Sequence, residues 1–125
     1  MTGSAIERQT DLIIRLATRF LELLPTVDPE FQQGFFRFKL EDRMHESCAS
    51  YVTQDDVFII GAFSHDVFFD DMNNLSVKIL SEMGTIPALL LLTVDQDFEY
   101  GIQFEYADMD RWHISLADGG TGLPS

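Results

Sequence analysis

The sequence predicts an α+β domain: a single antiparallel sheet of five to six strands with two helices packed on one face, in the order α-β-β-β-α-β-β-β. The hydrophobic period is helical near the N-terminus, changes to two-residue alternation, returns to helical in mid-chain, and then alternates again. The links between alternating segments are too short for parallel crossovers, which predicts antiparallel pairing. A chain of 125 residues with 46% hydrophobic residues and eleven Phe can bury one substantial core.

The first helix is expected at residues 4–24. Apolar side chains recur there at three- and four-residue spacing, which is typical of an amphipathic helix. Ser4 and Glu7 have the spacing of a capping box, in which each side chain accepts a backbone N–H bond. Pro25 is expected to end the helix, because proline has no N–H and cannot continue the hydrogen-bond ladder.

Three strands are expected next. Phe36, Phe38 and Leu40 alternate with more polar neighbours, which predicts the first strand. The expected successors are a polar connection at residues 41–46, a second strand at 47–53 and a third, strongly apolar strand at 57–63.

The second helix follows, with an apolar stripe from Met72 to Met83, Asp70 or Asp71 as its N-terminal cap, and Gly84 as its C-terminal cap. The later strands are expected at residues 87–94, 98–106 and 112–116. Residues 118–125 contain three Gly and one Pro and are expected to form a flexible C-terminal tail, which leaves a single domain at residues 1–117.

The net charge of the protein limits the classes of molecule that it can bind. The formal net charge is −13, and of the eight cationic side chains only Lys78 and Arg111 lie beyond Arg43. An acidic surface repels phosphates, so no nucleic-acid partner is expected. No apolar run is long enough to span a bilayer, and no signal peptide is visible. With the lone Cys48 unable to form an internal disulfide, the sequence predicts a cytoplasmic protein with no membrane partner.

Catalytic and metal-binding patterns are weak, so no enzyme activity, cofactor or metal is expected. Cys48 could act as a thiolate with a histidine base, but a small apolar residue within a strand explains it more simply. Asp70 and Asp71 are accounted for as helix-capping acids rather than as ligands. The histidines considered as bases are His45, His65 and His113, and the metal ligands considered are His65, Asp66, Asp70 and Asp71.

Protein recognition remains, through carboxylates beside aromatic residues. Trp112 and Tyr106 are candidate anchors, although Trp112 could equally belong to the core. The predicted contact residues are Glu99, Glu105, Tyr106, Asp108, Asp110 and Trp112, with Asp66, Asp70 and Asp71 as a second patch.

The run "IPALLLLTVDQDFEYGIQFEYADMDRW", which ends at Trp112, resembles the later hairpin of YezG-like immunity proteins. The leading helix with Leu23-Leu24-Pro25, followed by an aromatic strand, is similar too. Residues 41–69 depart from that pattern, and no catalytic signature is among the matching parts. The resemblance implies a cytoplasmic antidote that binds and blocks a cognate bacterial toxin, often a nuclease delivered by a neighbouring or sibling cell.

The sequence therefore predicts an immunity protein, a monomer or weak dimer, that neutralises a basic toxin by tight binding. An acidic secretion chaperone that binds an effector segment is the alternative, although such chaperones usually end in a further helix. A third reading is an enzyme built around His65 or His113.

Overall fold

The computed structural model describes the backbone of residues 2–124 and the side chains of residues 7–117 and 119–124. Its elements are α1 (Thr2–Val27), β1 (Gln33–Glu41), β2 (Met44–Val52), β3 (Val57–Ile59), α2 (Asp66–Met83), β4 (Ala88–Asp95), β5 (Tyr100–Glu105) and a short 3-10 helix, η1 (Ala117–Gly119).

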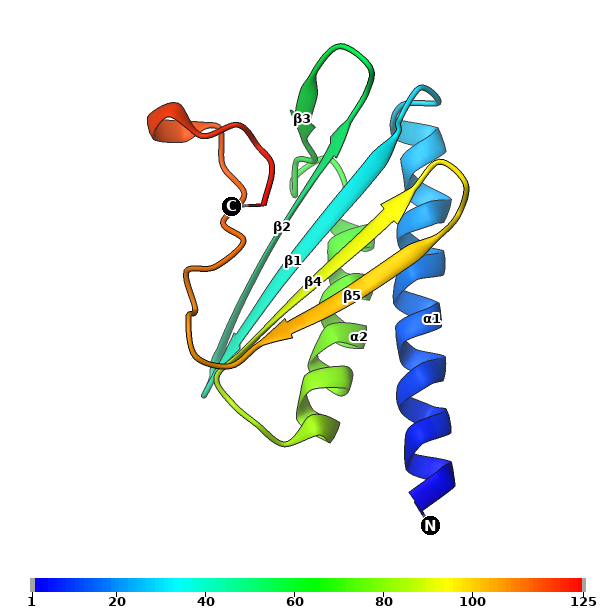
Figure 1. Ribbon diagram of the computed structural model, residues 1–125, viewed down its shortest axis with the longest axis vertical. Coiled ribbons are helices and arrows are strands. Elements are labelled where there is room, and N and C mark those ends of the chain that lie inside the picture. Colours follow the sequence, from blue (N-terminus) through cyan, green and yellow to red (C-terminus); the bar gives the residue numbers. More distant parts are fainter. Residues whose placement is uncertain (1, 125) are drawn as a thin grey trace.

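These described residues form one antiparallel five-stranded sheet of order β3-β2-β1-β4-β5. Both α-helices cover the same face of the sheet, and the C-terminal segment lies beyond the other face (Figure 1). We call these the helix face and the outer face. The predicted α+β class, with two helices on a single antiparallel sheet, is confirmed.

The main core fills the space between the sheet and the helices. The Phe20 ring of α1 lies 6.5 Å from Phe36 of β1 and 5.6 Å from Phe68 of α2. Gly34 lets α1 approach β1, since a Cβ at that position would lie 2.6 Å from Leu24 Cδ1. The packing of α1 therefore depends on a glycine in β1.

The expected bounds of α1 are wrong at its end, because the helix continues through Pro25 to Val27. Proline lacks only its own N–H, and so near the C-terminus of a helix it removes a single bond. The Asp28 N–H donates to the Leu24 carbonyl at 2.9 Å, which closes the last turn. The helix begins at Thr2, and the capping box predicted for Ser4 and Glu7 involves a side chain outside the described residues.

The predicted N-terminal cap of α2 is also wrong. The helix begins at Asp66 after His65, so Asp70 and Asp71 lie inside it. Burial of Phe68 and Phe69 against the core explains the extra turn, since both rings must be held in place by helical backbone. The predicted cap at Gly84 is confirmed, with φ +79° and its N–H on the Leu80 carbonyl.

Several strand bounds differ from the expectation. The strand expected at residues 98–106 spans only Tyr100–Glu105, because Phe98 adopts φ +64° in the β4–β5 turn. The predicted polar connection at residues 41–46 is mostly strand, with a turn at residues 42–43 only. The strand β3 ends at Ile59, with one further bond to β2 from the Ile60 N–H to the Ala49 carbonyl. The chain then turns toward α2, where the His65 N–H donates to the Ala62 carbonyl. Phe63, expected in this strand, is fully exposed instead.

The strand predicted at residues 112–116 does not form within the described chain. This segment packs on the outer face, where Trp112 adopts φ +59° and joins a second cluster with Leu89 and Leu91. In the predicted tail, Gly122 is buried, and its N–H donates to the Ser115 carbonyl at 2.9 Å. The flexibility of the tail and the division of the chain at residue 117 stay predictions.

Candidate functional site

A buried arginine holds the C-terminal segment on the outer face. Arg37 of β1 is only 3% exposed. Its Nε donates to the Arg111 carbonyl at 2.9 Å and its Nη2 to the Met109 carbonyl at 2.6 Å. Glu46 supplies the counter-charge at 3.4 Å from Nη1. The guanidinium is therefore paired and hydrogen-bonded, as a buried charge must be.

Glu105, one of the predicted contact residues, holds a loop. It accepts N–H bonds from Ala107 and Asp108 and lies 2.6 Å from Arg111 Nη1. The bond from Arg111, followed by the two backbone bonds, lowers the pKa of this carboxyl to about 2. This carboxylate is already used inside the molecule.

Of the other residues in the first predicted patch, one is buried and the rest are exposed to solvent. Trp112 is buried, and the Arg111 guanidinium lies 4.5 Å from its ring centroid. Asp108 accepts the Asp110 N–H at 3.0 Å, while both side chains remain exposed. The Tyr106 hydroxyl lies 3.7 Å from Met83 Sδ on a half-exposed ring. Of the two candidate anchors, Trp112 is therefore buried in the outer-face cluster, and Tyr106 is exposed.

The second predicted patch lies on α2. Asp71 forms an ion pair with Arg19 of α1 at 2.9 Å, so it ties the two helices together. Asp66 and Asp70 are exposed, and Phe63 and Val67 lie exposed close by in the sequence. Two carboxylates of this patch are therefore available beside apolar surface.

A group of seven carboxylates without an ion pair to a described residue comes from three loops that the sequence analysis treated separately. The α1–β1, β2–β3 and β4–β5 loops meet at one end of the sheet, because Gln33 of β1 pairs with both Val52 and Asp95. Bonds from the Gln32 N–H to the Val52 carbonyl and from the Gln96 N–H to the Gln32 carbonyl join them. We call this the acidic end, formed by Asp28, Glu30, Asp55, Asp56, Asp95, Asp97 and Glu99.

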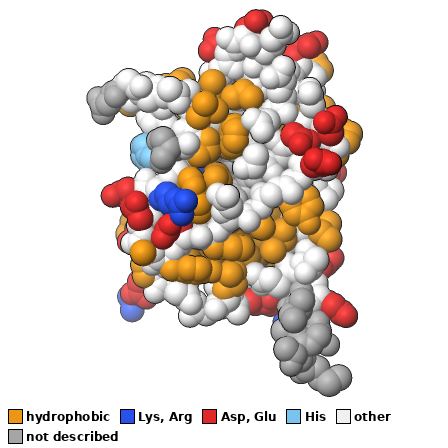
Figure 2. All heavy atoms as spheres, in the orientation of Figure 1, with side chains coloured by type: hydrophobic (Ala, Val, Ile, Leu, Met, Phe, Trp, Pro, Cys, Tyr) orange, Lys and Arg blue, Asp and Glu red, His pale blue; other side chains and the backbone are white. Residues whose placement is uncertain are grey.

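The acidic end has no neutralising partner within the described residues. None of its seven carboxylates forms an ion pair there, and the three loops contain no Lys or Arg. Figure 2 shows acidic atoms along this upper and right margin, around a central surface that is largely apolar and uncharged. Of the predicted contact residues only Glu99 belongs to this group. The sequence contains an indication of this group, because the α1–β1, β2–β3 and β4–β5 loops each carry two or more carboxylates. Alternate loops of an antiparallel sheet lie at the same end of it.

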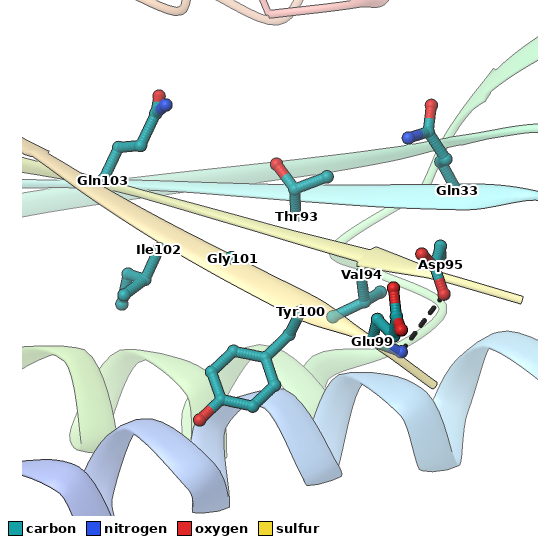
Figure 3. Close-up of a pocket in the computed structure, with 9 residues that line it drawn as sticks. All are labelled: Gln33, Thr93, Val94, Asp95, Glu99, Tyr100, Gly101, Ile102 and Gln103. Atoms are coloured by element: carbon teal, nitrogen blue, oxygen red, sulfur yellow. Dashed lines mark hydrogen bonds between the residues drawn. The ribbon is translucent and has the colours of Figure 1, made fainter. Parts of the chain in front are cut away.

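Two hollows open at the acidic end. One, of about 560 Å³, is lined by the first two loops and includes Asp28, Asp56 and Phe58. The other, of about 380 Å³, lies along β4 and β5 (Figure 3). Its outer side carries Thr93, Gln33 and Gln103, whereas Tyr100 and Ile102 point toward the helices. We call this second hollow the β5 groove.

Other chemistry has little support in this geometry. Cys48 is half-buried, and burial raises the pKa of its thiol, which opposes thiolate formation. Across the described residues, no group of three or more His, Cys, Asp or Glu side chains is arranged to hold a metal ion. None of the described helices is long and apolar enough to cross a membrane.

No protein-family model matches the chain, and no curated protein matches it either.

Proposed function

We propose that this protein is a bacterial immunity protein, which binds a basic protein toxin and blocks it without catalysis. The observation that carries the proposal is the unpaired acidic end, where seven carboxylates from three loops meet with no Lys or Arg among them. Such a surface attracts a cationic partner over a distance and excludes phosphate. A nuclease toxin fits this chemistry, because it must be basic where it contacts nucleic acid.

Neutralisation then needs only tight binding. The acidic end covers the cationic surface with which a nuclease toxin approaches its substrate, and the complementary fields speed capture before the toxin acts. Exposed aromatic surface at the same end, on Phe58 and Phe98, supplies apolar contact area. The resemblance of the Pro87–Trp112 region to YezG-like immunity proteins supports the same reading, with action in the cytoplasm.

The test pairs this protein with the product of a toxin gene beside its own. Co-expression should restore growth of cells that make the toxin, and the purified proteins should form a complex. Replacing Asp55, Asp97 and Glu99 with their amides should lower the association rate constant about tenfold at low salt, because steering depends on these charges. The side chains of these three residues accept no hydrogen bond from described groups, so the fold should be retained.

A matched control removes three charges elsewhere. Glu7, Glu22 and Asp42 are exposed and form no ion pair with described residues. Their amide variant should associate within about twofold of the original rate, since only the overall charge changes. Equal slowing in both triple variants would show that net charge, and not the acidic end, governs capture. A neighbouring toxin that neither binds nor loses toxicity would reject the immunity function.

An acidic secretion chaperone is the second candidate. The open edge of β5 favours it, because a free strand edge can hold an extended effector segment. Gel filtration separates the two proposals: a stable dimer that holds an unfolded effector segment favours the chaperone, whereas a monomer bound to a folded toxin favours the immunity protein.

A further inference from the structure

The two edge strands of the sheet, β3 and β5, differ in length and in their surroundings. The β3 edge is only three residues long, and Gly122 of the C-terminal segment packs against the side chains of Val57 and Ile59. The β5 edge is six residues long and contains neither Pro nor Lys, the residues that commonly protect an edge. After β5 the chain turns to the outer face, where Arg37 holds it, and leaves this edge open.

The pairing pattern identifies the open backbone groups. The Asp95 N–H donates to the Glu99 carbonyl at 3.0 Å, which marks these two as a hydrogen-bonded pair. Such pairs alternate along an antiparallel ladder, so Gly101 and Gln103 bond to β4. The N–H and carbonyl groups of Tyr100, Ile102 and Phe104 therefore point away from the sheet. No backbone bond joins them to another described residue on that side.

Gly101, in the middle of this edge strand, is not needed for internal packing. A Cβ built there meets nothing within 4 Å, whereas one at Gly34 would lie 2.6 Å from Leu24 Cδ1. Glycine weakens a strand, and it often marks a place where another backbone or a ligand approaches closely. At Gly101 the missing side chain keeps the β5 groove open above Thr93 (Figure 3).

The charges around the β5 groove favour a cationic ligand. Asp95 and Glu99 stand at one end of it, and neither is paired with a described cation. A second copy of this chain would bring another net charge of −13 to the edge, which opposes edge-to-edge pairing of two copies. An extended segment with Lys or Arg satisfies both the open backbone groups and the carboxylates.

We propose that the β5 edge binds an extended, basic segment of the protein partner as a sixth strand, with one Lys or Arg side chain over Gly101 beside Asp95 and Glu99. This proposal rests on the proposed function in one respect only, that the partner is a cationic protein. It adds a mode of binding, in which the backbone of β5 provides affinity and the acidic end provides selectivity.

A short fluorescein-labelled peptide of alternating lysine and valine is the probe, with a glutamate–valine peptide as its counterpart. Fluorescence anisotropy should show salt-sensitive binding of the lysine peptide to the full chain and none of the glutamate peptide. Amide chemical shifts should move at Tyr100, Ile102 and Phe104. Shifts confined to the β2–β3 and α1–β1 loops would overturn the proposal.

Two variants test the geometry. Tyr100→Pro removes an edge N–H at the first residue of an edge strand, where proline is tolerated, and Tyr100→Thr retains that N–H. Gly101→Val places a branched side chain in the groove, and its Cβ would meet no atom within 4 Å. Tyr100→Pro and Gly101→Val should each weaken peptide binding about tenfold, and Tyr100→Thr should change it less than about twofold. Thermal unfolding of each variant confirms that the fold is retained.

The outcomes separate the two proposals. If the toxin binds and the acidic-end variant slows its capture, but Tyr100→Pro and Gly101→Val have no effect, strand addition is wrong and the immunity function stands. If no toxin is neutralised while the lysine peptide binds at the β5 edge, the immunity function is wrong and the edge site stands. Self-association abolished by Tyr100→Pro would show that a second copy occupies the edge, and would overturn the proposal.

Discussion

The two ends of the sheet carry similar residue types but use them differently. At the acidic end, seven carboxylates lie without an ion pair to the described residues. At the opposite end, Lys39 lies 3.2 Å from Glu41 and 3.3 Å from Glu46, and Arg111 lies 2.6 Å from Glu105. We call this the paired end, formed by Lys39, Glu41, Glu46, Glu105 and Arg111, and Arg37 in the middle of β1 joins it through its ion pair with Glu46.

This contrast locates the negative field better than net charge does. At the paired end the charges satisfy one another, and they hold the C-terminal segment on the sheet. At the acidic end, Asp28, Asp56 and Asp95 accept backbone N–H bonds within their own loops, but no described cation offsets the repulsion among the seven carboxylates. The side chains of Glu30, Asp55, Asp97 and Glu99 accept no hydrogen bond from described groups, which leaves them to meet a partner. Substitution at the paired end should therefore change stability, and substitution at the acidic end should change binding.

The largest stability effect is expected for Arg37→Met. The variant leaves the carbonyls of Met109 and Arg111 without their donors in a buried site, which should lower the free energy of unfolding by about 3 kcal/mol. Trp112, the only Trp in the chain, should become more exposed, with red-shifted emission. Urea unfolding followed by this fluorescence measures both effects.

Arg43→Met is the control for this variant. Arg43 is exposed in the β1–β2 turn and forms no ion pair with described residues, so the change should stay within about 0.5 kcal/mol. Unchanged Trp emission in Arg37→Met would contradict the role given to this guanidinium.

The next largest effect is a pH-dependent contribution of Glu105 to the free energy of unfolding. Bonds from Arg111, Ala107 and Asp108 lower the pKa of Glu105 from 4.5 to about 2 in the folded chain. A carboxyl with a depressed folded pKa stabilises the fold above its unfolded pKa, and this contribution is lost as the pH falls through the folded value. Glu105→Gln should therefore be less stable than the original protein at pH 7, and the gap should narrow between pH 4.5 and about 2.

Urea unfolding at several pH values measures that gap. The Arg111→Met background is the control, since the bond that lowers the pKa most is absent there, and Glu105→Gln should then have a smaller pH-dependent effect. A gap that is constant from pH 7 to pH 2 would rule out the loop-holding role of Glu105.

Local periodicity was enough to predict the class of the fold. The alternation around Phe36 and Phe38 and the stripe that ends at Met83 follow from residues close in sequence, so both were placed correctly. The bounds that failed depend on tertiary contacts. The early start of α2 follows burial of Phe68 and Phe69, and no neighbour in sequence reveals that burial.

The candidate site was harder to predict for the same reason. Trp112 packs on the outer face because Arg37, far earlier in the chain, bonds to the carbonyls of Met109 and Arg111. The acidic end depends on the register that places Asp95 beside Gln33, and sequence alone does not fix that register. Glu99 was selected as a hairpin acid, and its companions in the other two loops became visible only once the loops met.

The smallest expected effect is on the melting temperature, which should change in opposite directions for variants of the acidic end and of the paired end. The triple amide variant of Asp55, Asp97 and Glu99 should raise the melting temperature by about 2 °C at low salt, because it relieves repulsion among like charges. Glu46→Gln should lower the melting temperature by a similar amount, since Glu46 pairs with both Arg37 and Lys39. Scanning calorimetry at two ionic strengths measures both. High salt should shrink both shifts, because exposed charges are screened. If the acidic-end variant melted lower than the original protein, its carboxylates would be structural, and the distinction between the two ends would fail.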